Sequence, residues 1–127
     1  MSGQDINALV HAGRTAQQRG DLPAASQYYL QALALQPDSP QLYNALGMVA
    51  LAAESYDKAA EYFLNAINAD PSASVLRINL ATAYRGLSDD PRERDALLAV
   101  LELDQAHLTA NLRLAELHEK LGEKGDA

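Results

Sequence analysis

The chain of 127 residues repeats itself at a spacing of 34 residues. The residues that recur at this spacing are Pro37 and Pro71, Gly13 and Gly47, Ala25 and Ala59, Tyr29 and Phe63, and Ala32 and Ala66. A fixed period of this size, with helix-forming residues between the marks, is typical of a helical solenoid whose repeats pack only on their neighbours. The repeat therefore predicts an all-α chain.

Prolines, glycines and capping residues divide each repeat into two helices. Ser39 followed by Pro40 predicts a helix start, and Gly20 predicts a helix end because glycine tolerates the left-handed backbone conformation found there. Asp21 and Asp89 are expected to cap the helices that follow them. The seven expected helices cover about 5–19, 23–35, 40–53, 56–69, 73–87, 91–103 and 107–121, and the last of them is expected to stop at Gly122.

The second repeat resembles the tetratricopeptide repeat at Tyr43, Leu46, Gly47, Ala59, Phe63, Ala66 and Pro71. The first repeat matches the same pattern at Leu9, Gly13, Ala25, Tyr29, Ala32 and Pro37. The resemblance covers nearly the whole chain and implies a right-handed α-solenoid of antiparallel helix pairs. We expect a single domain over 1–127, with repeats at about 6–39, 40–73 and 74–107 and a half repeat at 108–127.

The third repeat departs from the pattern. Arg77 replaces the aromatic residue, Glu93 stands where alanine is expected, and Leu97 replaces phenylalanine. In the third repeat, the fold is predicted by the repeat periodicity more than by the signature residues. In the repeats that match, we interpret the small residues as places of close helix approach, so that enlarging Ala59 would overpack the helix pair by about 1–3 kcal/mol.

Composition excludes several classes of function. The formal net charge is −7, with 17 acidic and 10 basic residues and no block of Lys and Arg, so neither nucleic acid nor an anionic membrane is an expected partner. The chain has no Cys and therefore no disulfide or zinc knuckle. It shows no secretory signal pattern and no apolar stretch of 18 residues, so we expect a cytoplasmic protein.

Catalytic and metal-binding patterns are weak. His11, His107 and His118 occupy unrelated positions of the repeat, and no second His stands at helical spacing from His118 to form a zinc site. Glu116 and Lys120 are spaced as an i,i+4 surface pair. We therefore assign this segment no enzymatic activity, no cofactor and no metal.

The resemblance implies that the first helix of each repeat lines a concave groove. In this groove Asn44 and Asn79 would contact a peptide backbone, Met48 and Ile78 would take apolar side chains, and Arg14 and Arg85 would meet acidic groups. The predicted groove residues are Asn7, Val10, Arg14, Gln41, Asn44, Met48, Ile78, Asn79, Thr82, Arg85 and Arg113.

The main hypothesis is a protein–protein interaction module that binds a peptide or partner segment in this groove. Relatives that clamp the carboxylate tail of chaperones use Lys, Asn and Arg at five groove positions. Here these positions hold Val10, Arg14, Ala45, Val75 and Asn79, which argues against a chaperone-tail clamp.

Two alternatives stay open. The segments 79–85, 89–90, 93–94, 103–105 and 115–119 resemble repeats that precede the catalytic domain in bacterial aspartyl/asparaginyl hydroxylase-like proteins, which implies a substrate-recruiting arm of a larger enzyme. The run 121–127 resembles the turn into a second helix, so we expect a chain cut from a longer protein. Such an end would leave Leu108, Leu114, Leu117 and Leu121 partly uncovered, which favours a self-associating scaffold, in the simplest case a homodimer.

Overall fold

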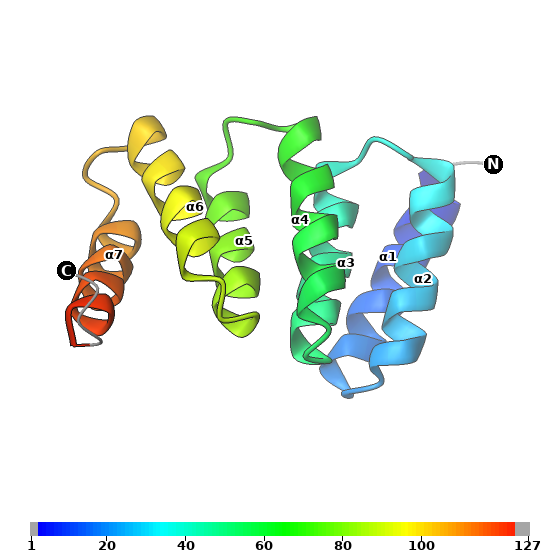
Figure 1. Cartoon of the computed structure of the whole chain (residues 1–127). Coiled ribbons are helices and arrows are strands. Elements are labelled where there is room, and N and C mark those ends of the chain that lie inside the picture. The colour runs from blue at the N-terminus through cyan, green and yellow to red at the C-terminus, as the bar shows by residue number, and fades with distance from the viewer. Residues whose placement is uncertain (1–2, 124–127) are drawn as a thin grey trace. The chain divides into compact units, whose positions relative to one another are not determined.

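A computed structural model describes residues 3–123, which form seven α-helices and no strand (Figure 1). The all-α prediction is confirmed, and each helix boundary lies within two residues of its expected position. The helices are α1 (Gly3–Gln18), α2 (Leu22–Leu35), α3 (Pro40–Ala52), α4 (Tyr56–Ala69), α5 (Ser74–Gly86), α6 (Asp90–Leu103) and α7 (Leu108–Glu123).

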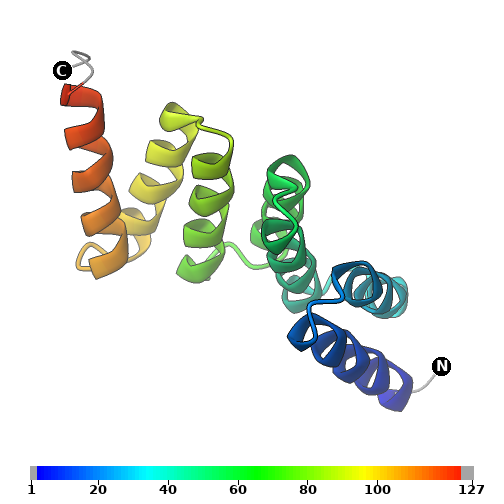
Figure 2. The same ribbon diagram turned by 90° about the horizontal axis from the view of Figure 1, so that it is seen from below.

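The chain divides into two compact units, which are described separately. Unit 1 covers Met1–Pro71, and within it α1 packs on α2, α2 on α3, and α3 on α4. Figure 1 shows α2 and α4 in front of α1 and α3, so that the first helices of the two repeats form one layer and the second helices another. Unit 2 covers Ser72–Ala127, and within it α6 packs on both α5 and α7 (Figure 2).

The predicted caps start the helices of both units. The backbone N–H of Leu42 donates to Ser39 Oγ at 3.2 Å, and the Arg92 N–H donates to Asp89 Oδ1 at the same distance. Each bond satisfies an N–H group that has no partner inside the first turn of its helix. A proline in the first turn follows both caps.

Helix ends repeat at the same 34-residue spacing. Gly20 has φ +77° after α1, as predicted, and its equivalents Glu54 and Ser88 have φ +59° and +57° after α3 and α5. These two residues adopt a conformation that favours glycine. The next equivalent, Gly122, was expected to end α7, but α7 continues to Glu123. Glycine permits the left-handed conformation without imposing it, so the residue alone does not end the helix.

The core of unit 1 is built on glycine facing an aromatic ring. A Cβ atom placed on Gly13 would lie 2.7 Å from the Tyr29 ring, and one placed on Gly47 would overlap the Phe63 ring in the same way. Ala25 is fully buried between the helices of the same repeat. The sequence-based interpretation of the small positions as close contacts is therefore correct.

The core of unit 2 uses other side chains at the same repeat positions. Ala81 and Leu97 stand where unit 1 has glycine and an aromatic residue, and both are fully buried. Glu93 stands at the alanine position of α6 and is only 1% exposed. Among the described residues it is the one charged residue in the buried core, so its partners matter for any site in this unit.

Candidate interaction surface

The predicted groove side chains of unit 1 lie on α1 and α3, in the layer behind α2 and α4. Four of them are exposed and supply two amides, one guanidinium and one thioether, namely Asn7, Gln41, Arg14 and Met48. Val10 is half-buried and packs against the core of unit 1. This face therefore offers apolar contacts together with polar groups that can bond to a peptide backbone.

A polar cluster at α1 joins this face to the core. The Tyr29 hydroxyl comes from α2 and donates to Gln17 Oε1 at 2.9 Å. Burial raises the pKa of Tyr29, and the positive charge of Arg14 partly opposes this rise. The charge of Arg14 therefore affects the Tyr29 hydroxyl, although Arg14 itself is exposed. A ligand carboxylate could reach the Arg14 guanidinium.

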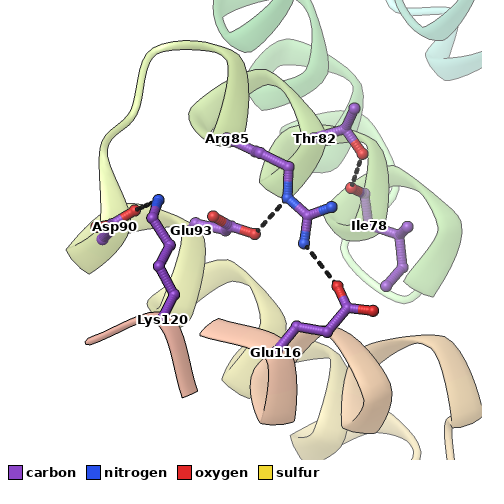
Figure 3. Close-up of polar contacts among 7 residues, drawn as sticks. All are labelled: Ile78, Thr82, Arg85, Asp90, Glu93, Glu116 and Lys120. Atoms are coloured by element: carbon purple, nitrogen blue, oxygen red, sulfur yellow. Dashed lines mark hydrogen bonds and ion pairs between the residues drawn. The ribbon is translucent and has the colours of Figure 1, made fainter. Parts of the chain in front are cut away.

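The predicted groove side chains of α5 are less accessible than expected. Ile78, Asn79 and Thr82 are all half-buried. The Thr82 hydroxyl donates to the Ile78 backbone carbonyl at 3.1 Å, one turn earlier in the same helix (Figure 3). The Thr82 donor is therefore already used, although its hydroxyl oxygen can still accept a bond.

Asn44 and Asn79 were predicted to contact a peptide backbone in the groove. The structure shows each of them half-buried and engaged in an interaction of its own. Each residue lies in the middle of a helix whose neighbouring turns are buried, which limits how far its short amide can extend into water. A ligand that bonds to either amide must therefore share or replace an existing interaction.

Arg85 holds together the polar part of unit 2 (Figure 3). Its Nε donates to Glu93 Oε2 at 3.1 Å, and its Nη2 donates to Glu116 Oε2 at 3.4 Å. The Glu93 side chain is 2% exposed, whereas the Arg85 side chain is 47% exposed. Arg85 was predicted to meet acidic groups of a ligand, but in this structure two carboxylates of its own chain already hold it.

Arg113 lies beside this cluster on α7. Burial and the charge of Arg85 lower the pKa of Arg113, while Glu93 and Glu116 oppose that effect. Its Nε is buried without a hydrogen-bond partner among the described residues. Two guanidiniums and two carboxylates therefore share a small region of unit 2, and their charges largely balance.

The predicted pair between Glu116 and Lys120 is wrong. Lys120 Nζ instead donates to Asp90 Oδ1 at 2.9 Å, and Glu116 bonds to Arg85 (Figure 3). Both bonds cross between helices, from α7 to α6 and from α7 to α5. Spacing along one helix could not show these partners, because they lie about 30 residues away in the sequence.

Residues 3–123 contain no helix with the length and apolar character of a membrane-spanning segment. No group of three or more His, Asp and Glu residues there is arranged to hold a metal ion.

Comparisons with known proteins agree with this geometry. A family model described as Tetratricopeptide repeat matches residues 11–74, which is half of the chain. The Sgt2 TPR domain from Aspergillus fumigatus is 22% identical with a TM-score of 0.85, covering 99% of this chain and 84% of that one. The second TPR domain of human RPAP3, solved in complex with an HSP70 peptide, is 20% identical with a TM-score of 0.82, covering 91% of this chain and 96% of that one.

A third structure, the first TPR of Spaghetti (RPAP3) bound to an HSP90 peptide, is 17% identical with a TM-score of 0.85. The match covers 96% of this chain and 97% of that chain. At these identities the three structures establish the fold alone. The resemblance to hydroxylase-like proteins stays a prediction.

Proposed function

The chain belongs to the tetratricopeptide repeat family, and from this we propose that it is a protein-interaction module that binds a partner polypeptide. The tetratricopeptide module is a non-catalytic interaction domain. The observation that carries the proposal is the family match over 11–74, which spans α2, α3 and α4 and the second half of α1. The proposed contact face in unit 1 is the one formed by α1 and α3.

The chemistry of this face supports a peptide ligand. Met48 is 38% exposed, so its flexible thioether can pack against an apolar side chain of the ligand. Asn7 and Gln41 are exposed amides that can donate to and accept from a peptide backbone. Arg14 adds a positive charge for an acidic side chain. In unit 2 we propose contacts by Ile78, Asn79, Thr82, Arg85 and Arg113.

The solved structures with chaperone peptides support a peptide ligand in general. The chemistry of the clamp positions argues for a different peptide here. Val10, Ala45 and Val75 offer no cation or amide at positions where a carboxylate clamp needs them. We propose a partner segment held by backbone amide contacts and apolar side chains, with acidic residues opposite Arg14.

The net charge of −7 also leads us to propose a polypeptide rather than a nucleic acid as the partner. A cytoplasmic location and a homodimer remain predictions. The single domain over 1–127, with its half repeat at 108–127, also remains a prediction.

The test starts from a library of random 12-residue peptides displayed on phage and selected on the full chain. We expect the double variant Asn44→Ala, Asn79→Ala, which removes one amide from each unit, to weaken binding of the selected peptides about tenfold or more. Each lost hydrogen bond has a net contribution of about 0.5–1.5 kcal/mol, and a tenfold change corresponds to about 1.4 kcal/mol. Affinity is measured by isothermal titration calorimetry.

The control is Asn65→Ala, Asn68→Ala, which makes the same two substitutions at exposed positions of α4, in the other layer of unit 1. This control should bind the selected peptides as the unaltered chain does. Equal affinity in the Asn44/Asn79 variant, or an equal loss in the control, would contradict the proposed contact face.

A further inference from the structure

The two carboxylates that bond to Arg85 differ in how deeply they are buried. The Glu93 side chain is 2% exposed and accepts from Arg85 Nε at 3.1 Å, whereas the Glu116 side chain is 65% exposed and accepts from Arg85 Nη2 at 3.4 Å. Figure 3 shows these carboxylates approaching Arg85 from α6 and from α7. Glu116 can therefore leave Arg85 for water, while Glu93 cannot leave without becoming a buried unpaired charge.

Arg113 of α7 is a second guanidinium in the same region. It shares none of the ion pairs that hold Arg85 and Lys120, and its Nε is buried without a hydrogen-bond partner among residues 3–123. Burial and the charge of Arg85 both lower the pKa of Arg113. A further carboxylate within reach of both guanidiniums would stabilise both positive charges.

Glu116 does not serve both guanidiniums. It stands three residues after Arg113 on α7, yet among residues 3–123 it bonds to Arg85 and not to Arg113. Its attachment to the helix that also carries Arg113 restricts where its two oxygens lie. A carboxylate on a separate chain has no such restriction, and its two oxygens can accept one bond from each guanidinium.

The cluster is open to solvent at a cavity of about 270 Å³ in unit 2. Its lining residues are Arg85, Glu93, Glu116, Leu117 and Lys120. Glu116 and Lys120 are exposed at its rim, and Leu117 is buried. An acidic side chain that enters this cavity would meet two cations and one carboxylate that is free to move away.

We propose that Glu116 is an internal competitor for the Arg85 and Arg113 guanidiniums, and that an acidic side chain of the partner polypeptide binds them by displacing it. The inference rests on the proposed peptide-binding function and adds the chemistry that unit 2 recognises. Neither arginine stands at a carboxylate-clamp position, since the clamp positions of unit 2 hold Val75 and Asn79. We therefore assign the site to a side-chain carboxylate and not to the C-terminal one.

The probes are the 12-residue peptides selected on the unaltered full chain. They are synthesised with an acetylated N-terminus and an amidated C-terminus, so that every carboxylate belongs to a side chain. Each acidic residue is replaced in turn by its own amide, which removes the charge and nearly keeps the shape. We expect one position at which the amide weakens binding about fivefold or more in isothermal titration calorimetry.

Chain variants assign that position to the cluster. Glu116→Gln removes the competitor, so it should tighten binding of the acidic peptide about threefold or more and leave its amide counterpart nearly unchanged. The matched control Glu102→Gln removes the same charge from an exposed position of α6, on the opposite face of that helix from Glu93. This control should change the affinity of neither peptide.

Two substitutions of Arg113 separate binding from folding. Arg113→Gln should erase the preference for the acidic peptide over its amide counterpart. Arg113→Lys keeps the charge but lacks the planar pair of donors, so it should reduce that preference while the chain stays folded. The thermal midpoint of each variant shows whether the fold is kept, and Arg113→Lys alone decides the question if Arg113→Gln does not fold.

Three results would overturn the proposal while leaving the peptide-binding function standing. The first is a set of tightly bound peptides in which no acidic residue can be identified by its amide. The second is an equal response of the acidic peptide to Glu116→Gln and Glu102→Gln. The third is an amide peptide that regains tight binding, and its response to Glu116→Gln, when its C-terminal carboxylate is left free. A selection that yields no binding peptide would instead contradict both proposals.

Discussion

Unit 1 and unit 2 bring two helices of one repeat close together with different chemistry. Unit 1 uses shape alone, because glycine leaves room for the rings of Tyr29 and Phe63. Unit 2 has a methyl group at Ala81 in place of that glycine, and a carboxylate at Glu93 in place of a small apolar side chain. A repeat position that looks restricted to small residues thus accepts a charged one when a partner is within reach.

The partner is supplied by a residue eight positions earlier. Arg85 Nε donates to Glu93, and the Arg85 side chain remains 47% exposed, so the guanidinium keeps part of its hydration. Unit 1 has Leu51 at the position of Arg85 and Ala59 at the position of Glu93. The ion pair satisfies the buried carboxylate, but it need not make unit 2 more stable than an alanine would.

The largest effect is expected when the buried carboxylate of unit 2 is introduced at the equivalent position of unit 1. Ala59→Glu should destabilise the chain by roughly 4 kcal/mol or more, because it adds volume at a fully buried site and leaves a carboxylate without a cation. Adding Leu51→Arg should recover much of that loss by rebuilding the pair. Urea denaturation followed by circular dichroism measures both steps, and a double variant no more stable than the single one would show that the two units are not equivalent here.

The second prediction removes the cation from unit 2. Arg85→Met keeps the apolar stem but leaves Glu93 buried without its partner, so it should destabilise unit 2 by about 3–5 kcal/mol. Glu93→Ala alone should change the free energy of unfolding far less, and adding it to Arg85→Met should restore stability. If Glu93→Ala destabilises the chain as much as Arg85→Met does, the Arg85–Glu93 ion pair contributes net stability and does more than satisfy the buried carboxylate.

The third prediction concerns the glycine of unit 1. Gly47→Ala should destabilise the chain by about 1–3 kcal/mol, although alanine is the better helix former, because the added methyl overlaps the Phe63 ring. In unit 2 the reverse change, Ala81→Gly, should also destabilise, by about 1 kcal/mol from helix propensity. The measurement is the shift in the denaturation midpoint, and a stabilising Gly47→Ala would show that Phe63 can move aside.

The smallest expected effect concerns the hydroxyl group by which Tyr29 differs from Phe63, the equivalent residue of the second repeat in unit 1. Tyr29→Phe should cost about 0.5–1.5 kcal/mol near neutral pH by removing the hydrogen bond to Gln17. Because burial in the folded chain raises the pKa of Tyr29 above its ordinary value of 10.0, the unfolded chain loses this proton first as the pH increases. The stability associated with Tyr29 is therefore present below pH 10 and is lost as the pH rises through the raised pKa.

The difference in stability between the unaltered chain and Tyr29→Phe should accordingly shrink above pH 10. Thermal denaturation at a series of alkaline pH values gives this difference directly. A constant difference across that range would mean that the Tyr29 hydroxyl is not buried in the way the structure describes.

The sequence by itself determined the helices, their boundaries and the small contact positions. These features are local or periodic: capping bonds such as that of Ser39 join residues three apart, and the 34-residue repeat marks Gly13 and Gly47 without knowledge of their neighbours. The charge of −7 is likewise a property of composition. Such features can be predicted from a single sequence because each depends on nearby residues.

Only the tertiary structure decided which charges meet. Glu116 and Lys120 lie one turn apart on α7, yet they bond to Arg85 and Asp90 on other helices, since a short cross-helix bond beside a buried carboxylate outweighs a solvated pair on one helix.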